Sequence, residues 1–315
     1  MTAKSQYLVR ACPLCGAQAP SAMEVCTQPR AQDLPFEDLV PQWNGFYKDK
    51  AIFSYARCPH CSLLYAPIYF TESQLGNLYA QMPPNMDEVP EAALERTQRG
   101  YFDVFRRHSP LTGSYIEVGP DVGLFTKNCV RDGNFDRYWL FEPNDDVRPM
   151  LEKVVSGQRA QIVQDMFGFP ALPDGEASTA VMIHVLDHLL DPLKTLQVLR
   201  TKLRPDARLM LVTHDEGSLL RKLVAVRWPA FCLQHPQIYR PDTMRSLLRA
   251  AGFEVLALEK TTNHFRLDFL LKHLLWAFGI KIKNLPSFGG LTLGLKLGNM
   301  LTVATPSDTT SELQI

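Results

Sequence analysis

Residues 115–127 read YIEVGPDVGLFTK, in which an apolar run is followed by two glycines and then by a helical pattern. The run YIEV has the aromatic and β-branched content of a buried strand. Gly119 would let the backbone turn sharply and approach a ligand, and Gly123 would let the start of a helix pack closely on a sheet. A strand that turns through glycines into a helix is the first unit of a doubly wound α/β fold.

Six further strand-like runs follow the glycine turn. They are YWLFE (138–142), QIVQ (161–164), AVMIHV (180–185), ARLMLVT (207–213), EVLAL (254–258) and MLTVA (300–304). Helix-length patterns such as DPLKTLQVLRTKL (191–203) and RPDTMRSLLRAAG (240–252) separate most of them. This alternation predicts an α/β fold with a doubly wound, mostly parallel, seven-stranded Rossmann-like sheet.

Four of the seven cysteines form two C-x-x-C pairs, Cys12 with Cys15 and Cys58 with Cys61. Each pair is a tight turn that aims two thiolates at one point, and four thiolates make the closed tetrahedral site that zinc prefers. A redox C-x-x-C motif has no need of a second copy, so two unrelated thiol pairs are the weaker alternative. We therefore expect a structural zinc site in a small zinc-ribbon-like domain, 1–70, whose folding is driven by metal binding. The aromatic residues that would supply its core are Trp43, Phe46, Tyr47, Phe53 and Tyr55.

The rest of the chain divides into three parts. A helical linker is predicted at 71–111, the sheet domain at 112–305, and a disordered polar tail at 306–315. The sheet domain carries a long apolar insertion at about 264–298, between the sixth and seventh strands. We interpret it as a lid over an acceptor site or a dimer contact, or alternatively as a peripheral membrane surface for a lipid-linked acceptor, because lysines accompany its apolar residues.

The overall composition limits the classes of partner that we expect the protein to bind. Lysine plus arginine and aspartate plus glutamate each total 33, which leaves no basic field for a nucleic acid. No stretch approaches the roughly 20 apolar residues that cross a bilayer, and the first residues lack the apolar core of a signal peptide. We expect a soluble, cytoplasmic protein with a small-molecule partner and no transmembrane segment.

The position of one acidic residue indicates which class of ligand the glycine turn would bind. Glu142 ends the second strand, 23 residues after Gly119, where a carboxylate can accept hydrogen bonds from both hydroxyls of a ribose. A dinucleotide fold would place G-x-G-x-x-G in the turn, whereas this chain has the spacing G-x-x-x-G. These observations predict a nucleoside ligand.

Four quoted motifs resemble those of class I S-adenosylmethionine-dependent methyltransferases over nearly the whole chain. They are YIEVGPDVG, VQDMFGFP, VMIHVLDHLLDPLKTL and HPQIYRPDTMRSLLRAAGFEV. The chain looks most like a subgroup with an N-terminal zinc-binding segment found among sugar and natural-product methyltransferases (methyltransferase type 11/23-like). The resemblance implies that S-adenosylmethionine is bound at the turn and at the next two strand ends. The implied cofactor-binding residues are Glu117, Gly119, Asp121, Gly123, Glu142, Asp165 and Met166.

The same resemblance assigns roles to these residues. Glu117 and Gly119 would face the methionine part of the cofactor and Glu142 its ribose, while Asp165 would contact the adenine amino group and Met166 would lie beside the ring. Asp121 stands where the family usually has the middle glycine of its turn. This side chain supports an alternative function, in which the protein is a catalytically degenerate methyltransferase-like binding or scaffold protein.

Methyl transfer requires alignment of a nucleophile and, for a hydroxyl or a carbon acid, removal of a proton. Histidine suits that task because its pKa lies near neutral pH. The candidate catalytic residues are His235, in the aromatic segment RWPAFCLQHPQIY, and His188, with Tyr239 assisting by a hydrogen bond. His184 is expected to be a core histidine whose ring nitrogens are hydrogen-bonded.

We expect an enzyme that methylates oxygen or carbon of a sugar, glycan or natural-product intermediate. A zinc-ribbon enzyme that modifies nucleic acid is disfavoured by the neutral charge.

Overall fold

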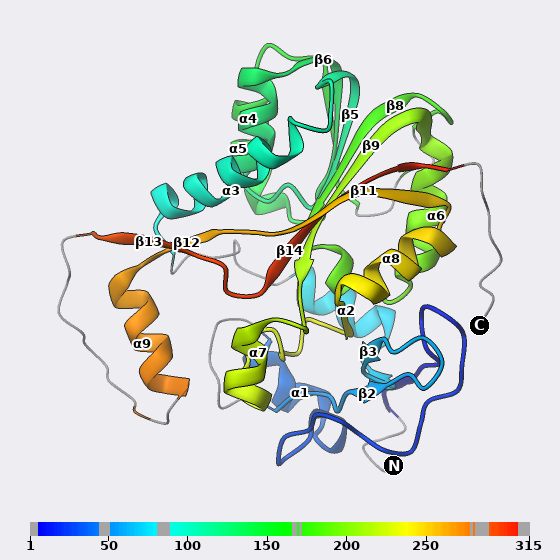
Figure 1. Ribbon diagram of the computed structural model, residues 1–315, viewed down its shortest axis with the longest axis vertical. Helices are drawn as coiled ribbons and strands as arrows, with labels where there is room; N and C mark the ends of the chain where they lie inside the picture. Colours follow the sequence, from blue (N-terminus) through cyan, green and yellow to red (C-terminus); the bar gives the residue numbers. More distant parts are fainter. Residues whose placement is uncertain are drawn as a thin grey trace.

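A computed structural model gives the fold of the 315-residue chain (Figure 1). It describes residues 6–43, 51–80, 89–165, 169, 172–277, 280 and 290–307. A twisted central sheet occupies the middle of the molecule, and the N-terminal segment, in blue, lies below the arrowhead of β9 in this view. The N-terminal segment is therefore close to the carboxyl end of that strand.

The central sheet has seven strands in the order β11-β14-β9-β8-β5-β6-β7. All neighbours from β9 to β7 pair in parallel, whereas β14 is antiparallel to both β9 and β11. The seven strands expected from the sequence are all present, so the predicted fold class is confirmed. Their bounds are β5 Thr112–Val118, β6 Asn134–Phe141, β7 Ala160–Val163, β8 Ala177–Ile183, β9 Leu203–His214, β11 Phe253–Lys260 and β14 Asn299–Pro306.

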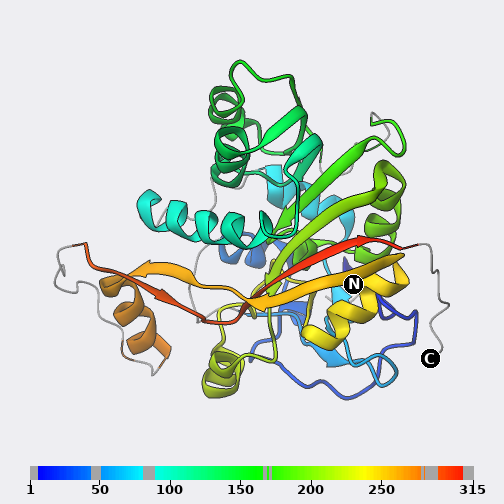
Figure 2. The same cartoon turned by 45° about the horizontal axis from the view of Figure 1, so that its top comes forward.

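Helices cover both faces of this sheet, because its central strands are apolar on both sides. Along β5, Tyr115 packs with one helical layer, whereas Ile116 and Val118 pack with the other. The first layer contains α3 (Glu91–Phe105), α4 (Leu124–Asp132) and α5 (Arg148–Val154), and the second contains α6 (Pro192–Lys202) and α8 (Pro241–Ala250). Figure 2 shows α3 and α8 on opposite sides of the sheet.

The N-terminal segment contains short strands and helices. Their bounds are β1 Leu8–Val9, α1 Phe36–Leu39, β2 Ala56–Arg57, β3 Leu64–Tyr65, β4 Ile68–Tyr69 and α2 Glu72–Ala80. Short 3-10 helices lie at Ala31–Asp33, Val40–Gln42, Asp145–Val147, Leu186–His188 and Ala225–Arg227.

This segment shares its sheet and its core with the chain after β9. Strand β3 pairs with β10 (Gln237–Ile238), and α7 (Leu219–Val224) lies nearby in the sequence. Phe53 and Tyr55 pack in one cluster with Trp228 and Phe231, and Trp43 belongs to the same cluster. Phe46 and Tyr47, also expected in this core, lie outside the described residues. The cysteine-bearing segment is therefore built into the larger fold by packing and by strand pairing.

The predicted insertion forms an arm that extends away from the sheet (Figures 1 and 2). It contains β12 (Asn263–Arg266), α9 (Leu267–Ala277) and β13 (Thr292–Leu295), with β12 and β13 paired antiparallel. Its base is fixed to α3, because Tyr101 Oη donates to Asn263 Oδ1 at 3.0 Å and the amide of His264 donates to Thr97 Oγ1 at 2.8 Å. Residues 278–279 and 281–289 lie outside the described part, so both interpretations of the insertion stay predictions.

Among the described residues, no helix combines the length and apolar character that crossing a membrane requires.

Candidate functional site

The glycine turn after β5 keeps a left-handed backbone at three alternating positions. Gly119, Asp121 and Gly123 have φ values of 65°, 52° and 79°. A Cβ atom on Gly119 would lie 2.6 Å from Cγ2 of Val185, and one on Gly123 would lie 3.0 Å from Cδ2 of Leu151. Only glycine fits the first position without movement, because left-handed φ and a close neighbour act together. Asp121 adopts the conformation that a middle glycine would adopt, which aspartate tolerates better than most residues.

Glu142 ties this turn to the end of β6. Its Oε2 accepts the amide of Asp121 at 3.0 Å and its Oε1 accepts the amide of Asn144 at 2.9 Å. Burial raises the pKa of Glu142, while these two amides oppose the rise. A carboxylate offers about four acceptor positions, so two remain for the hydroxyls of a ribose. The turn itself thus holds Glu142, the residue predicted to bind the ribose, in place.

Two further predicted cofactor contacts, Asp165 and Met166, follow the residues of β7 in the sequence. Asp165 is exposed and follows that strand by two residues. Met166 lies outside the described residues. Both assignments stay predictions.

Glu117 lies on the α4 side of β5, where Oε2 accepts hydrogen bonds from Tyr115 Oη at 2.6 Å and from Thr126 Oγ1. It is only 2% exposed, and burial raises its pKa to about 7 although both hydroxyls lower it. Its described hydrogen-bond partners are therefore protein hydroxyls on the face covered by α3, α4 and α5. Contact with the methionine part of the cofactor stays a prediction for this residue.

Four histidines meet at the carboxyl ends of β8 and β9, and we call them the histidine cluster: His184, His188, His214 and His235. The ring centroids are 4.9 Å apart for His184 and His214, 4.6 Å for His214 and His235, and 4.8 Å for His188 and His235. In a parallel sheet, ligands bind at this edge. The cluster adjoins the glycine turn, because Val185, which lies against Gly119, follows His184 directly.

Asp187 lies at the base of the histidine cluster and is fully buried. Its Oδ2 accepts both the backbone amide of His214 at 2.9 Å and a hydrogen bond from His214 Nδ1 at 2.6 Å. Burial raises the pKa of Asp187, but the imidazoles of His214, His235 and His184 outweigh it and bring that pKa to about 2. The chain therefore holds an ionised carboxylate beneath the imidazoles.

The two predicted catalytic histidines have different surroundings. His235 is buried, and its Nδ1 lies 2.7 Å from the carbonyl oxygen of Ala230 and 3.3 Å from Cys232 Sγ. Burial lowers the pKa of His235, but Cys232, Asp187 and that carbonyl outweigh it and raise the pKa to about 9. His188 is half-buried, and burial lowers its pKa well below the usual value.

Two tyrosines are associated with this region. Tyr79 Oη lies 3.1 Å from His188 Nδ1. Tyr239, the predicted assistant, is fully buried, and its hydroxyl donates to the carbonyl oxygen of Leu186 at 3.4 Å. Tyr239 thus contacts the 3-10 turn that carries Asp187 and His188.

His184 corrects one expectation, because it is not a satisfied core histidine. It follows the last residue of β8, has φ of 53°, and its Nδ1 is buried without a hydrogen-bond partner. Strand alternation does not apply to it, since the backbone has already left the strand.

The four paired cysteines converge as predicted. Cys12 Sγ lies 3.4 Å from Cys61 Sγ, Cys15 Sγ lies 3.4 Å from Cys58 Sγ, and all four sulfurs are within 4.8 Å of one another. Tetrahedral zinc with bonds of about 2.3 Å would separate its sulfurs by about 3.8 Å. The thiol of Cys61 and the amides of Leu14 and Cys15 lower the pKa of Cys12, although burial opposes them. The cluster is compatible with zinc.

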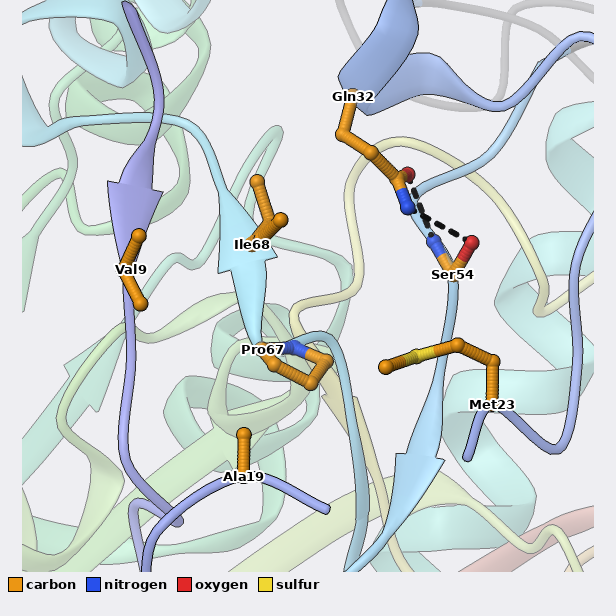
Figure 3. A pocket seen from close by; sticks show the side chains of 7 residues that line it. All are labelled: Val9, Ala19, Met23, Gln32, Ser54, Pro67 and Ile68. Carbon is orange, nitrogen blue, oxygen red and sulfur yellow. Dashed lines mark hydrogen bonds between the residues drawn. The ribbon is translucent and has the colours of Figure 1, made fainter. Parts of the chain in front are cut away.

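A small apolar pocket lies elsewhere, in the N-terminal segment (Figure 3). Its two polar lining residues, Gln32 and Ser54, hydrogen-bond to each other, with Gln32 Nε2 donating to Ser54 Oγ at 2.8 Å and the amide of Ser54 donating to Gln32 Oε1 at 3.1 Å. Val9, Ala19, Met23, Pro67 and Ile68 complete the lining. None of the described residues that line this pocket has an ionisable side chain.

Comparison with known families agrees with this geometry. Residues 90–258, more than half of the chain, match the family described as a methyltransferase domain. The chain belongs to the methyltransferase domain family. The matched range contains the glycine turn, Glu142 and the whole histidine cluster. Both family and fold are those of class I S-adenosylmethionine-dependent methyltransferases.

Three solved structures with a similar fold are distant in sequence from this chain. A chain of the complex that contains the Haloferax volcanii Trm112 methyltransferase activator is 13% identical, with a TM-score of 0.50 over 69% of this chain and 93% of that chain. An S-adenosylmethionine-dependent methyltransferase from Aquifex aeolicus is 13% identical, with a TM-score of 0.46 over 75% and 99% of the two chains. One from Archaeoglobus fulgidus is 15% identical, with a TM-score of 0.47 over 67% and 94%. No curated protein matches the sequence.

Sequence reasoning missed three residues of this candidate site: Asp187, His214 and Cys232 contact the predicted histidines without having been assigned a role. For His214 a signal existed, since a polar residue directly after the apolar run 207–213 lies at the ligand edge of a parallel sheet. Cys232 gave none, because its distance from His235 depends on the fold of a loop.

Proposed function

We propose that this protein transfers a methyl group from S-adenosylmethionine to oxygen or carbon of a small acceptor, a sugar, glycan or natural-product intermediate. The observation that carries the proposal is the glycine turn held by Glu142, inside a chain of the methyltransferase domain family. The acceptor class comes from the resemblance of the motifs to sugar and natural-product methyltransferases. The zinc-compatible cysteine cluster supports the same subgroup.

The chain's own residues fit the cofactor. Gly119 and Gly123 allow the turn to pack against Val185 and Leu151 with a left-handed backbone, and that turn would receive the cofactor. Glu142 would accept the two ribose hydroxyls, and Asp165 would contact the adenine amino group. Asp121 would lie beside the amine of the methionine part, where its charge matches an ammonium group.

The acceptor would lie against the histidine cluster. In the transfer, a bond forms between the acceptor atom and the methyl carbon, the bond from that carbon to the sulfonium sulfur breaks, and S-adenosylhomocysteine leaves. S-adenosylmethionine supplies the methyl group and a good leaving group. A hydroxyl or carbon acid also releases a proton. His188 would accept it as a neutral imidazole, whereas His235, whose pKa is raised to about 9, would accept it only in its deprotonated form, so turnover through His235 would increase as pH rises toward 9. Because the ring of His188 is only half-buried, the acceptor would be able to reach His188 and His235.

Calorimetric titration of the zinc-replete protein with S-adenosylmethionine and S-adenosylhomocysteine tests the cofactor. We expect micromolar binding, weakened at least tenfold in Glu142→Gln, because each charge-assisted hydrogen bond contributes about 1.5–3 kcal/mol. Glu152→Gln, an exposed position on α5, is the matched control and should bind normally. Equal binding by both variants would contradict the assignment of Glu142.

Transfer itself is tested with S-adenosylmethionine that carries a deuterated methyl group and a panel of nucleotide-linked and free sugars. Mass spectrometry should detect the labelled product with the wild type. His235→Gln should abolish the product while cofactor binding stays near normal, and an unchanged rate would leave His188→Gln as the next test. Cofactor binding with no labelled product from any acceptor would favour the scaffold function.

A further inference from the structure

Three residues of the histidine region have ligand atoms that converge on one point. His184, Asp187 and His214 each offer an imidazole nitrogen or a carboxylate oxygen, and these atoms lie within 4.8 Å of one another. They come from three places, the end of β8, the following 3-10 turn and the end of β9. Two histidines and one carboxylate form a common donor set for first-row divalent ions.

Two polar atoms of these residues are buried and have no hydrogen-bond partner in the part of the chain that the structure describes. They are Oδ1 of Asp187, in a residue with no exposed surface, and Nδ1 of His184. Buried polar atoms in proteins are almost always paired, and an unpaired one costs about 1–3 kcal/mol. The other carboxylate oxygen of Asp187 already accepts two hydrogen bonds from His214. A cation between Asp187 and His184 would satisfy both unpaired atoms.

The backbone of His184 and the side-chain amide of Asn299 also favour a metal ion at this position. His184 has φ of 53°, a conformation that costs a residue with a Cβ roughly 1–2 kcal/mol and is common at functional sites. Its Nε2 lies 3.3 Å from the side-chain amide of Asn299 on β14. Metal-bound histidines usually donate their second nitrogen to a fixed acceptor, and the amide oxygen of Asn299 takes that role when the amide is turned over.

We propose that His184, Asp187 and His214 bind a divalent transition-metal ion such as Zn²⁺, separately from the four-cysteine site. Three protein ligands leave positions open for water or substrate, as in catalytic sites, whereas the cysteine site is closed. The site accepts an ion that prefers imidazole and carboxylate donors. It stands beside the glycine turn through Val185, which lies between His184 and Leu186 and against Gly119.

The function of the ion rests on the proposed methyl transfer. An acceptor with a hydroxyl would bind at an open position, where the ion lowers the pKa of that hydroxyl and fixes its direction. The half-buried His188 would accept the released proton, and the oxygen would then receive the methyl group as the bond from the methyl carbon to the sulfonium sulfur breaks. Ion binding itself needs neither cofactor nor acceptor, so it is tested alone.

The competing explanation is that Asp187 only orients His214, as in a carboxylate–imidazole pair. That pair accounts for Oδ2 of Asp187 and leaves Oδ1 and His184 Nδ1 unpaired. A metal ion bound at this site would also give Oδ1 of Asp187 and Nδ1 of His184 a partner.

Metal content of the full-length protein tests the proposal. The protein is treated with a strong chelator, reloaded with Zn²⁺ or Co²⁺, passed through a desalting column and analysed for metal per chain. The wild type should hold two ions, whereas His184→Ala and Asp187→Asn should each hold one. His108→Ala is the matched control, because this histidine lies outside the set, and it should hold two.

Cobalt spectra separate the two sites, since only thiolate ligands give intense sulfur-to-cobalt charge-transfer bands. These bands should remain in His184→Ala, while the weaker visible bands of the imidazole and carboxylate site disappear and its affinity falls at least 100-fold. A wild type that holds a single ion, or variants that keep the second, would overturn the proposal. Calorimetry with S-adenosylhomocysteine on the same samples reports separately whether the cofactor site is functional.

Discussion

The hydroxyl of Tyr55 donates a 2.5 Å hydrogen bond to the backbone carbonyl of His235, 180 residues further along the chain. The pairing of Tyr65 with Gln237 between β3 and β10 joins the same two segments. The hydroxyl of Tyr69 donates to the carbonyl of Leu233. The cysteine-bearing segment therefore fixes the loop that carries the predicted catalytic histidine.

We expect Tyr55→Phe to destabilise the protein by about 1–3 kcal/mol, because it leaves the buried carbonyl of His235 without its donor. The loop around His235 should also exchange its amide hydrogens faster. Urea denaturation and hydrogen–deuterium exchange measure the two effects.

Tyr7→Phe is the matched control for that prediction. Its hydroxyl also donates to a distant carbonyl, that of Leu34, at 2.8 Å, but within the N-terminal segment. It should leave exchange around His235 unchanged. Equal exchange in both variants would contradict a positioning role for Tyr55.

Replacement of one thiolate in the cysteine cluster should release the metal. We expect Cys12→Ser to hold one ion fewer per chain and to lower the melting temperature by several degrees, because binding energy at a structural zinc site contributes to folding. Cys26→Ser is the control, since this cysteine is exposed and outside the cluster. Retention of the ion in Cys12→Ser would contradict the zinc assignment.

The seven strands could be predicted because each is a local apolar run, and the fold follows from their alternation with helices. The convergence of the cysteines could be predicted as well, since their spacing is itself the signal. The pairing of β3 with β10 could not. Two-residue strands carry no periodicity, and their partner is chosen by packing.

Some residues of the candidate site could likewise be predicted from the sequence, and others could not. Gly119 and Glu142 occupy positions that the strand pattern marks, and the structure joins them through the amide of Asp121. His184 was misjudged because alternation was extended one residue past the end of β8, where φ turns positive. His214 and Asp187 are 27 residues apart and meet only because β8 and β9 are neighbours.

Glu117 should make stability fall as pH rises. The folded pKa of about 7 exceeds the reference value of 4.5, so its contribution is fully present below about pH 4.5 and is lost as pH rises through 7. Glu117→Gln cannot ionise and should gain up to about 3 kcal/mol relative to wild type between pH 5 and pH 8. Urea denaturation at both pH values measures this, with the exposed Glu254→Gln as control. A Glu117→Gln difference that does not change with pH would contradict it.

The charge of Asp121, rather than its backbone, should contribute to cofactor affinity. The left-handed φ is already that of glycine, so Asp121→Gly should change the free energy of unfolding by less than about 1 kcal/mol. Asp121→Asn removes the charge and keeps the side chain. Because the charge of Asp121 would pair with the ammonium group of the cofactor, both variants should bind S-adenosylhomocysteine more weakly by a similar factor. Tighter binding by both variants would show that the charge repels the cofactor carboxylate, and a change in Asp121→Gly alone would identify the side chain's volume instead.

The contact between Gly119 and Val185 should couple the cofactor turn to the histidine segment. In Gly119→Ala the new methyl group would lie 2.6 Å from Val185 Cγ2, at a positive φ that disfavours side chains. Strain and overpacking together should lower the free energy of unfolding by roughly 2 kcal/mol or more, and cofactor binding should weaken. Val185→Ala alone removes buried methyl groups and should cost about 1–3 kcal/mol. In the double variant the steric part disappears while the left-handed strain remains, so the combined loss should be smaller than the sum of the two single losses by about 1 kcal/mol. Urea denaturation of the four proteins gives this coupling energy, and strict additivity would mean that the turn and the segment at 184–188 do not press on each other.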